Sequence, residues 1–240
     1  MGGGGAEIKS ARKLRLMCLH GFRTSGEIIR KQLTAKWPES VLDKLELVFA
    51  DAPFPCQGKS QVEGIFYPPY YEWFQFNKEF TEYVNFDECL AYIEDYMIKH
   101  GPFDGLLGFS QGAILSVALA GMQANGVALT RVPKIKLVVI ISGAKFRNPS
   151  IIEKTYSAPI QCRSVHFIGD QDFLKEYGTE LLDSFVDPVV IRHPNGHTIP
   201  RFDEEGLKSM LTFLERMQKE VIEQKQEISL QNDDVEECLI

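Results

Sequence analysis

A serine, an aspartate and a histidine occur in an order along this chain that suits nucleophilic attack on an acyl group. Ser110 lies in the stretch Gly108-Phe109-Ser110-Gln111-Gly112, which has the form Gly-x-Ser-x-Gly. In a nucleophile elbow this serine sits on a sharp strand-to-helix turn, and small neighbours let the backbone and the helix approach closely. An apolar run precedes Gly108 and a helical pattern follows Ser110, so the required context is present. We predict that Ser110 is a nucleophile rather than a serine that merely lies in a glycine-rich turn.

A serine hydroxyl needs a base to remove its proton and an acid to orient that base. Among the five histidines, His197 follows Asn195-Gly196, a turn that can bring its side chain back over a sheet. His193 is the competing base, but it ends a strand and is held by Pro194, which better suits bracing the loop. We therefore predict that His197 is the base.

Asp172 is the predicted acid, in the turn Gly169-Asp170-Gln171-Asp172. Asp170 could face the same way, although aspartate in a turn commonly bonds the turn's own amides. Asp187 would need a different loop to reach the base. The order Ser110, Asp172, His197 is the order of serine, acid and histidine along an α/β-hydrolase chain.

Acyl transfer develops an oxyanion, and backbone N–H groups must already face it. One predicted donor is the amide of Gln111, the residue after the nucleophile. The second is the amide of Phe22, in the loop after the first strand, where Gly21 permits a close approach. The chain lacks a His-Gly-Gly-Gly form, and His20 could act in catalysis, although bracing this loop suits it better.

Alternating apolar runs and helical patterns predict the elements that position these residues. A strand is expected to end at Gly108, and five others are expected at 14–19, 45–50, 136–141, 164–168 and 188–191. Helices are expected at 84–99, at 173–185 and in an amphipathic stretch from 207 to 221, whereas 144–159 reads as an irregular insertion. Such alternation predicts an α/β fold with a mostly parallel sheet and helices on both faces. Sites then form at the carboxyl ends of the strands.

Residues 62–80 are rich in aromatic side chains and keep neither a helical nor a strand period. They predict a long loop that packs onto the core, or a cap over the site, and the two are compatible. Tyr71, Trp73 and Phe74 are the candidate substrate-pocket residues. This stretch motivates the hypothesis that the substrate carries an apolar acyl or alkyl arm.

Length and composition limit the class of protein. A chain of 240 residues with 44% hydrophobic content can form one large domain. We expect a flexible N-terminus over residues 1–12, one domain over 13–222 and a disordered tail over 223–240. The net charge of −7, without a basic stripe, speaks against nucleic-acid binding.

The cysteines and the apolar runs bear on location. The five cysteines are odd in number and scattered, which favours a reducing compartment over a disulfide framework or a zinc site. No apolar run approaches the length of a membrane span. We predict a cytosolic protein, with the nucleus possible, and the sequence leaves the oligomeric state open.

Several short motifs together give the chain a family resemblance. They are Leu19-His20-Gly21-Phe22, Asp51-Ala52-Pro53, Tyr71-Glu72-Trp73-Phe74, the segment Phe103 to Gly112, Val139 to Gly143, and His193 to His197. With these residues the chain resembles the family of serine hydrolases known from yeast, to which the ovarian-cancer-associated serine hydrolase of mammals is related. The resemblance implies an α/β-hydrolase fold without a large cap domain, a Ser-Asp-His triad, and esterase activity on alkyl or acyl esters. Members often have Gly-Gly before the final histidine, where this chain has Asn195-Gly196.

Residues and resemblance together predict a serine hydrolase that cleaves carboxylic esters through an acyl-enzyme on Ser110. The expected partner is a small-molecule ester, and no metal or organic cofactor is required. Two alternatives stay open: an acyl thioesterase with the same machinery, and a ligand-binding receptor or scaffold on a hydrolase fold.

Overall fold

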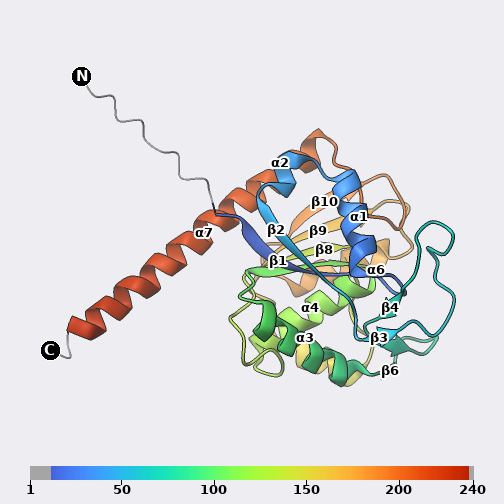
Figure 1. Ribbon diagram of the computed structural model, residues 1–240, viewed down its shortest axis with the longest axis horizontal. Helices are drawn as coiled ribbons and strands as arrows, with labels where there is room; N and C mark the ends of the chain where they lie inside the picture. Colours follow the sequence, from blue (N-terminus) through green and yellow to red (C-terminus); the bar gives the residue numbers. More distant parts are fainter. Residues whose placement is uncertain (1–11, 238–240) are drawn as a thin grey trace.

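The structure is a computed structural model that describes the backbone of residues 12–237 and the side chains of residues 12–224. Its centre is a six-stranded sheet in the order β10-β9-β8-β7-β1-β2, in which every pairing is parallel (Figure 1). The strands are β1 (Leu14–Leu19), β2 (Leu45–Ala50), β7 (Gly105–Phe109), β8 (Leu137–Ile141), β9 (Arg163–Gly169) and β10 (Val189–His193). The central strands are buried on both faces, as near-continuous apolar runs require.

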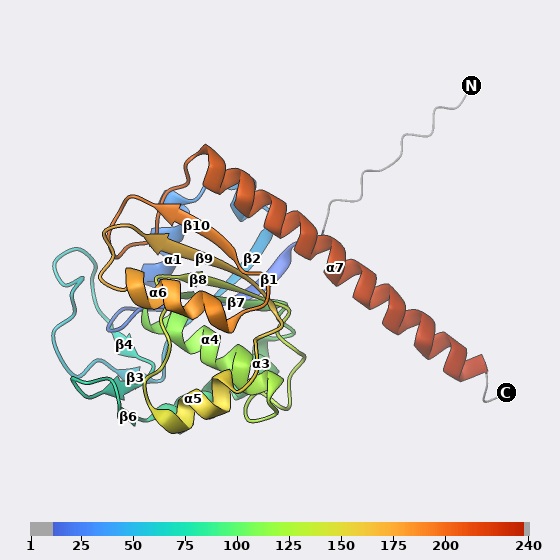
Figure 2. The same cartoon turned by 180° about the vertical axis from the view of Figure 1, so that it is seen from behind.

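Helices cover both faces of the sheet (Figures 1 and 2). One face packs against α1 (Gly26–Lys36), α2 (Glu39–Leu42) and α7 (Glu204–Glu237). The other packs against α3 (Phe86–His100), α4 (Gln111–Ala124), α5 (Pro149–Tyr156) and α6 (Lys175–Leu181), which leads into the short 3₁₀ helix η1 (Leu182–Ser184). This arrangement confirms the predicted α/β fold.

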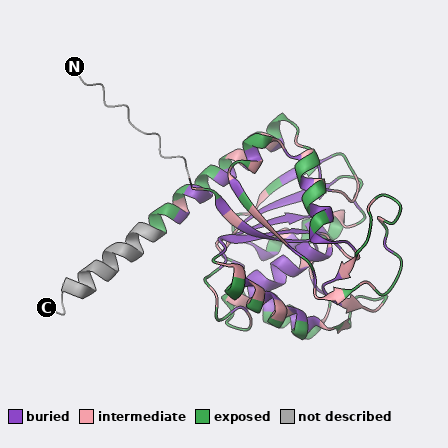
Figure 3. Ribbon diagram, in the orientation of Figure 1, coloured by how far each residue is buried: buried purple, intermediate pink, exposed green. Residues whose placement is uncertain are grey.

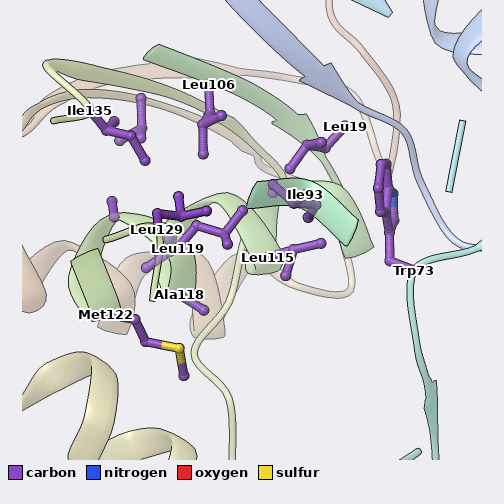
Figure 4. Packing of buried hydrophobic residues seen from close by; sticks show 14 of the residues in the cluster. Leu19, Trp73, Ile93, Leu106, Leu115, Ala118, Leu119, Met122, Leu129 and Ile135 are labelled. Carbon is purple, nitrogen blue, oxygen red and sulfur yellow. The ribbon is translucent and has the colours of Figure 1, made fainter. Parts of the chain in front are cut away.

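Alternate residues of each strand supply two separate apolar cores. In β1, Leu16 and Cys18 face the core under α1 and α7, whereas Met17 and Leu19 face the core under α3 and α4. Figure 3 shows the buried sheet between helices whose outer faces are exposed. Figure 4 shows part of the second core, where Leu106 of β7 faces α4. Because each strand is buried on both faces, its register in the sheet is fixed. The position of the residue that follows the strand is therefore fixed as well.

The aromatic stretch contains strand pairs too short to produce a readable period. β3 (Phe54–Pro55) pairs with β4 (Tyr71–Glu72), and β5 (Gln75–Phe76) pairs with β6 (Tyr83–Val84), each antiparallel and two residues long. Two residues cannot show the alternation from which a strand is recognised. Between β4 and β5 the chain enters the core.

One expectation about secondary structure was wrong. Residues 144–159 were expected to be irregular, but they contain α5. The helix begins at a recognisable signal, because the Asn148 side chain accepts from the amides of Ser150 and Ile151, and Pro149 occupies the first turn. The helix expected around 173–185 is confirmed: it begins at Lys175 as α6 and continues as the 3₁₀ helix η1 to Ser184.

The C-terminal segment also differs from expectation. Disorder was predicted from residue 223, but α7 is a single helix that continues to Glu237. Residues 223–237 include four glutamates and three glutamines, which are good helix formers, so the low hydrophobicity that indicated disorder is equally compatible with a helix. The domain boundary at 222 stays a prediction.

The chain ends and the cellular location are largely untested. Residues 238–240 and, except for Arg12, the predicted flexible N-terminus lie outside the described residues. Within the described part, no helix is long and apolar enough to cross a membrane. The cytosolic location stays a prediction.

Candidate active site

Ser110 occupies a tight turn between β7 and α4. Its backbone has φ 54° and ψ −116°, a positive φ that is rare for a residue other than glycine. Its amide donates to the Ile141 carbonyl oxygen at 3.0 Å, which ties the turn to the neighbouring strand. A Cβ on Gly108 would lie 2.3 Å from the Gly112 carbonyl oxygen, and one on Gly112 would lie 2.0 Å from that of Leu19. Both glycines are therefore required by the close approach of backbone to backbone.

The structure brings the three predicted catalytic residues into one hydrogen-bonded chain. His197 Nε2 lies 2.9 Å from Ser110 Oγ. His197 Nδ1 lies 3.0 Å from Asp172 Oδ1 and 3.2 Å from Oδ2. Ser110, Asp172 and His197 follow β7, β9 and β10, so three parallel strands deliver them to the same edge of the sheet. The imidazole can thus accept the serine proton while its other nitrogen donates to the carboxylate.

The Asp172 carboxylate accepts two further hydrogen bonds besides the one from the His197 imidazole. Ser142 Oγ donates to Asp172 Oδ2 at 2.5 Å, and the Leu174 amide donates to Oδ1 at 2.9 Å. Burial opposes ionisation of this carboxyl, but the bonds from His197, Ser142 and the Leu174 amide outweigh it and hold the pKa of Asp172 below its ordinary value. The carboxylate is therefore charged when it faces the imidazole.

Ser142 was not among the residues predicted from the sequence to serve the site, although it directly follows the buried run 136–141. A usable signal was present, since polar residues directly after buried parallel strands meet at one edge of a sheet.

The competing acids are engaged elsewhere. Asp170 is exposed and forms an ion pair with Lys175 at 3.4 Å. Asp187 lies 3.9 Å from Arg216 and has no contact with the site among its described ion pairs. Neither carboxylate hydrogen bonds His197 within the described residues.

The competing base, His193, is buried, and burial lowers its pKa. Neither of its ring nitrogens has a hydrogen-bond partner among the described residues. His193 ends β10 and pairs in register with Gly169, four residues before His197. Its role in bracing the loop that carries His197 stays a prediction.

One predicted oxyanion donor, Gln111, follows Ser110 directly, and the other, Phe22, lies in the loop after β1. Gln111 begins α4, and the loop after β1 passes so close that a Cβ on Gly21 would lie 3.6 Å from Ser110 Cβ. Among the hydrogen bonds of the described turns and loops, the Phe22 and Gln111 amides have no acceptor. Their role as oxyanion donors stays a prediction.

His20 braces the loop after β1, residues 20–24, which carries the predicted oxyanion donor Phe22 and which we call the oxyanion loop. Its ring is fully buried, its Nε2 accepts from the Ala52 amide at 3.0 Å, and its Nδ1 lies 2.8 Å from the Gly21 carbonyl oxygen. Those contacts require a neutral ring protonated on Nδ1. Burial lowers the pKa of His20 to about 4, which agrees with a neutral structural histidine.

The brace segment, residues 71–76, holds the same loop from outside the sheet. The Trp73 indole N–H donates to the His20 carbonyl oxygen at 2.9 Å, and the Tyr71 amide donates to that of Thr24 at 2.7 Å. Trp73 is also tied to the elbow, because its amide donates to Gln111 Oε1 at 3.1 Å. The structure thus links the oxyanion loop to the elbow through one segment.

This placement bears on the predicted pocket residues. Trp73 is 0% exposed and Phe74 is 2% exposed, while Tyr71 is half-buried. Figure 4 shows Trp73 next to Leu19 in the core. Their role in substrate binding stays a prediction, and what the contacts show is a brace.

Other aromatic rings lie beside His197 and beside the loop that follows β1. Phe173 is 70% exposed and its ring centroid lies 4.4 Å from that of His197. On the oxyanion side, Phe22 contacts Phe76 at 4.8 Å, and Phe76 stacks on Phe80 at 4.9 Å. We call Phe22, Phe76, Phe80 and Phe173 the aromatic rim.

A parallel sheet with helices on both faces, a serine at a Gly-x-Ser-x-Gly turn, and a histidine and an aspartate from later strands define the α/β-hydrolase class. Comparison with known proteins identifies the family within it. Residues 9–207 match the family described as serine hydrolase (FSH1), and the chain belongs to that family. The family resemblance seen in the sequence is thereby confirmed.

Its relatives include named esterases. An esterase of Anopheles gambiae is 32% identical over 201 residues, covering 78% of this chain and 72% of the relative. The esterase OVCA2 of Bos taurus is 30% identical over 206 residues, covering 78% and 89%. The chain is thus a hydrolytic enzyme that acts on esters.

Solved structures confirm the fold class. Acyl-protein thioesterase 2 of Zea mays aligns with a TM-score of 0.60 over 89% of this chain and 97% of that chain, at 18% identity. Esterase PE8 aligns with a TM-score of 0.55 over 88% and 95%, at 20% identity. At this identity the likeness speaks for the fold alone.

Proposed function

We propose that this protein cleaves carboxylic esters through a catalytic triad of Ser110, His197 and Asp172. The observation that carries the proposal is the chain of hydrogen bonds from Ser110 Oγ through His197 to Asp172. A serine alone is a weak nucleophile, and this arrangement is the one that activates it.

The reaction follows from the geometry in two halves. His197 Nε2 takes the Ser110 proton as Oγ attacks the acyl carbon, and the Phe22 and Gln111 amides receive the oxyanion. His197 then donates that proton to the leaving alcohol, which leaves an acyl-enzyme on Ser110. In the second half, His197 takes a proton from water as the water oxygen attacks the acyl carbon, and it returns that proton to Ser110 Oγ as the carboxylic acid is released.

The aromatic rim supports a finer proposal, that the substrate is a small-molecule ester with an apolar acyl or alkyl arm. Phe80 and Phe173 are 44% and 70% exposed, and the rim's ring contacts lead from the oxyanion residue Phe22 outward to Phe80. Burying a methylene group contributes about 0.8 kcal/mol, so each added carbon that reaches the rim should raise kcat/KM severalfold.

The decisive experiment is labelling with a fluorophosphonate probe, together with ester turnover, for the wild type and Ser110→Ala. We expect labelling and turnover in the wild type and loss of labelling in the variant, with turnover reduced by about 10⁴-fold or more. Folded wild-type protein that is not labelled at Ser110 would falsify the proposal. Labelling without turnover of any ester or thioester would favour a binding role instead.

The substrate arm is tested with the same assay on esters of rising chain length. We expect Phe80→Ala to flatten the chain-length dependence, whereas Ile98→Ala, an exposed apolar side chain on α3, should leave it unchanged. No rise of kcat/KM with chain length in the wild type would contradict the apolar arm, and equal dependence in all three proteins would contradict the role of Phe80. Matched oxygen esters and thioesters in this series decide between an esterase and a thioesterase.

A further inference from the structure

We propose that Ser142 is a positioning residue of this active site, which holds the Asp172 carboxylate toward His197 by donating its hydroxyl proton. The proposal rests on the proposed function of Ser110, His197 and Asp172. It extends the chain of hydrogen bonds by one member, from Ser110 through His197 and Asp172 to Ser142.

The first argument is the division of donors over the carboxylate. Oδ1 of Asp172 accepts from the Leu174 amide and from His197 Nδ1 at 3.0 Å, while Oδ2 accepts from Ser142 at 2.5 Å and lies 3.2 Å from the same His197 nitrogen. With a donor on each oxygen, the carboxylate cannot rotate without losing a bond. Leu174 and Ser142 thus hold the plane in which the carboxylate meets the imidazole.

The second argument is burial. Ser142 is 4% exposed and Asp172 is 6% exposed. Bulk water has little access to replace a lost donor, and a buried charged acceptor without its partner is costly. Removing the Ser142 hydroxyl should therefore weaken the alignment of Asp172.

The third argument is the backbone at the ends of two adjacent strands. β7 and β8 pair in parallel up to Phe109 and Ile141, and the next residues are Ser110 and Ser142. Both serines have a positive φ, 54° and 56°. This conformation favours glycine, so a serine at position 142 strains the backbone. The hydrogen bond from its hydroxyl to Asp172 is the interaction that can offset this strain.

The variants Ser142→Ala and Ser142→Gly separate the hydroxyl from the backbone. Both remove the donor, but glycine accepts the positive φ while alanine is strained there. Ser164→Ala is the matched control, since Ser164 is 1% exposed and its hydroxyl bonds His166 instead of the triad. We expect Ser142→Ala and Ser142→Gly to lower kcat by about 10- to 100-fold, and the control to lower it less than about twofold.

The pH profile gives a readout that a purely structural role would not move. Without the hydroxyl, Asp172 becomes a stronger acceptor toward His197 and stabilises the imidazolium, so the acidic limb of kcat/KM should move to higher pH. The other titratable groups nearby are His193 of β10, the Asp170–Lys175 ion pair, and Lys36 of α1, which donates to Thr198 and Ile199. All of them are retained in every variant.

A measurement without turnover keeps the two proposals distinguishable. The His197 Nδ1 proton, bonded to Asp172, should give a downfield proton NMR signal that shifts or broadens in both Ser142 variants and stays in place in Ser164→Ala. Failure of Ser110 labelling would contradict the proposed function whatever this signal does. An unmoved signal, or full activity in Ser142→Gly, would overturn the role of Ser142.

Discussion

Asp170 and Asp172 lie two residues apart in one turn, yet their surroundings differ in burial and in hydrogen-bond partners. Asp172 is buried and accepts from His197, Ser142 and the Leu174 amide. Asp170 is exposed and paired with Lys175. Only the first carboxylate can orient an imidazole, because orientation requires an acceptor that is itself held in place.

These two residues provide a matched pair of variants. We expect Asp172→Asn to lower kcat by about 10³- to 10⁴-fold, because an amide that donates toward the imidazole favours the wrong tautomer. Asp170→Asn should stay within about threefold of the wild type, since an exposed ion pair contributes little. Steady-state kinetics on one ester checks both, and similar losses in the two variants would contradict our choice of acid.

At the scale of elements, the brace segment connects two parts of the proposed machinery. It bonds the oxyanion loop through the Trp73 indole and the elbow through the Gln111 side chain. Arg23, in the oxyanion loop, also pairs at 2.7 Å with Glu72, whose carboxylate is fully buried. A shift of the brace would thus move the Phe22 amide relative to Ser110.

The two tryptophans of the chain offer a test of the brace. Trp73→Phe removes the donor to the His20 carbonyl oxygen, which should cost about 1–3 kcal/mol of unfolding free energy and lower kcat about tenfold. Trp37→Phe is the control, because Trp37 is also buried but its indole nitrogen has no hydrogen-bond partner among the described residues. Urea unfolding and kcat are measured for both. An equal effect on kcat would mean that Trp73 acts only through packing.

The same elements show what could be predicted from the sequence. The predicted bounds of β1 and β2 agree with the observed ones, because a short apolar run between turn residues indicates a buried strand and its two ends. α5 was missed because an eight-residue helix has too few turns to show a stripe. Ser142 and the brace depend on contacts between segments far apart in sequence, as in the bond from Trp73 to His20. Motif spacing carries no information about such contacts.

At the scale of the whole molecule, buried neutral histidines make stability depend on pH. Burial lowers the pKa of His20 to about 4 and that of His166 to about 3. In the unfolded chain a histidine takes up its proton near pH 6.5. Below that pH the unfolded state binds protons that the folded state does not bind. The free energy of unfolding therefore falls as the pH decreases toward 4.

The expected slope is about 1.4 kcal/mol per pH unit for each such histidine below pH 6. His166→Gln should therefore reduce the loss of stability between pH 6 and 5 by about that amount, whatever its effect at pH 7. Urea unfolding at pH 7, 6 and 5 checks the difference in slope. Parallel curves for the wild type and the variant would contradict the assignment.

The order of the strands has a consequence for how the enzyme would lose activity and for when it becomes active during synthesis. Ser110, Asp172 and His197 follow β7, β9 and β10, so the chain adds them outward from the middle of the sheet, and the imidazole comes last, after an edge strand paired only with β9. A nascent chain would carry its nucleophile well before it could use it. In the folded protein, fraying of that edge strand would remove His197 from Ser110 and so lower the reactivity of the serine, while the interior of the sheet stayed folded. Reactivity of Ser110 would then be a gauge of whether the last strand is in place.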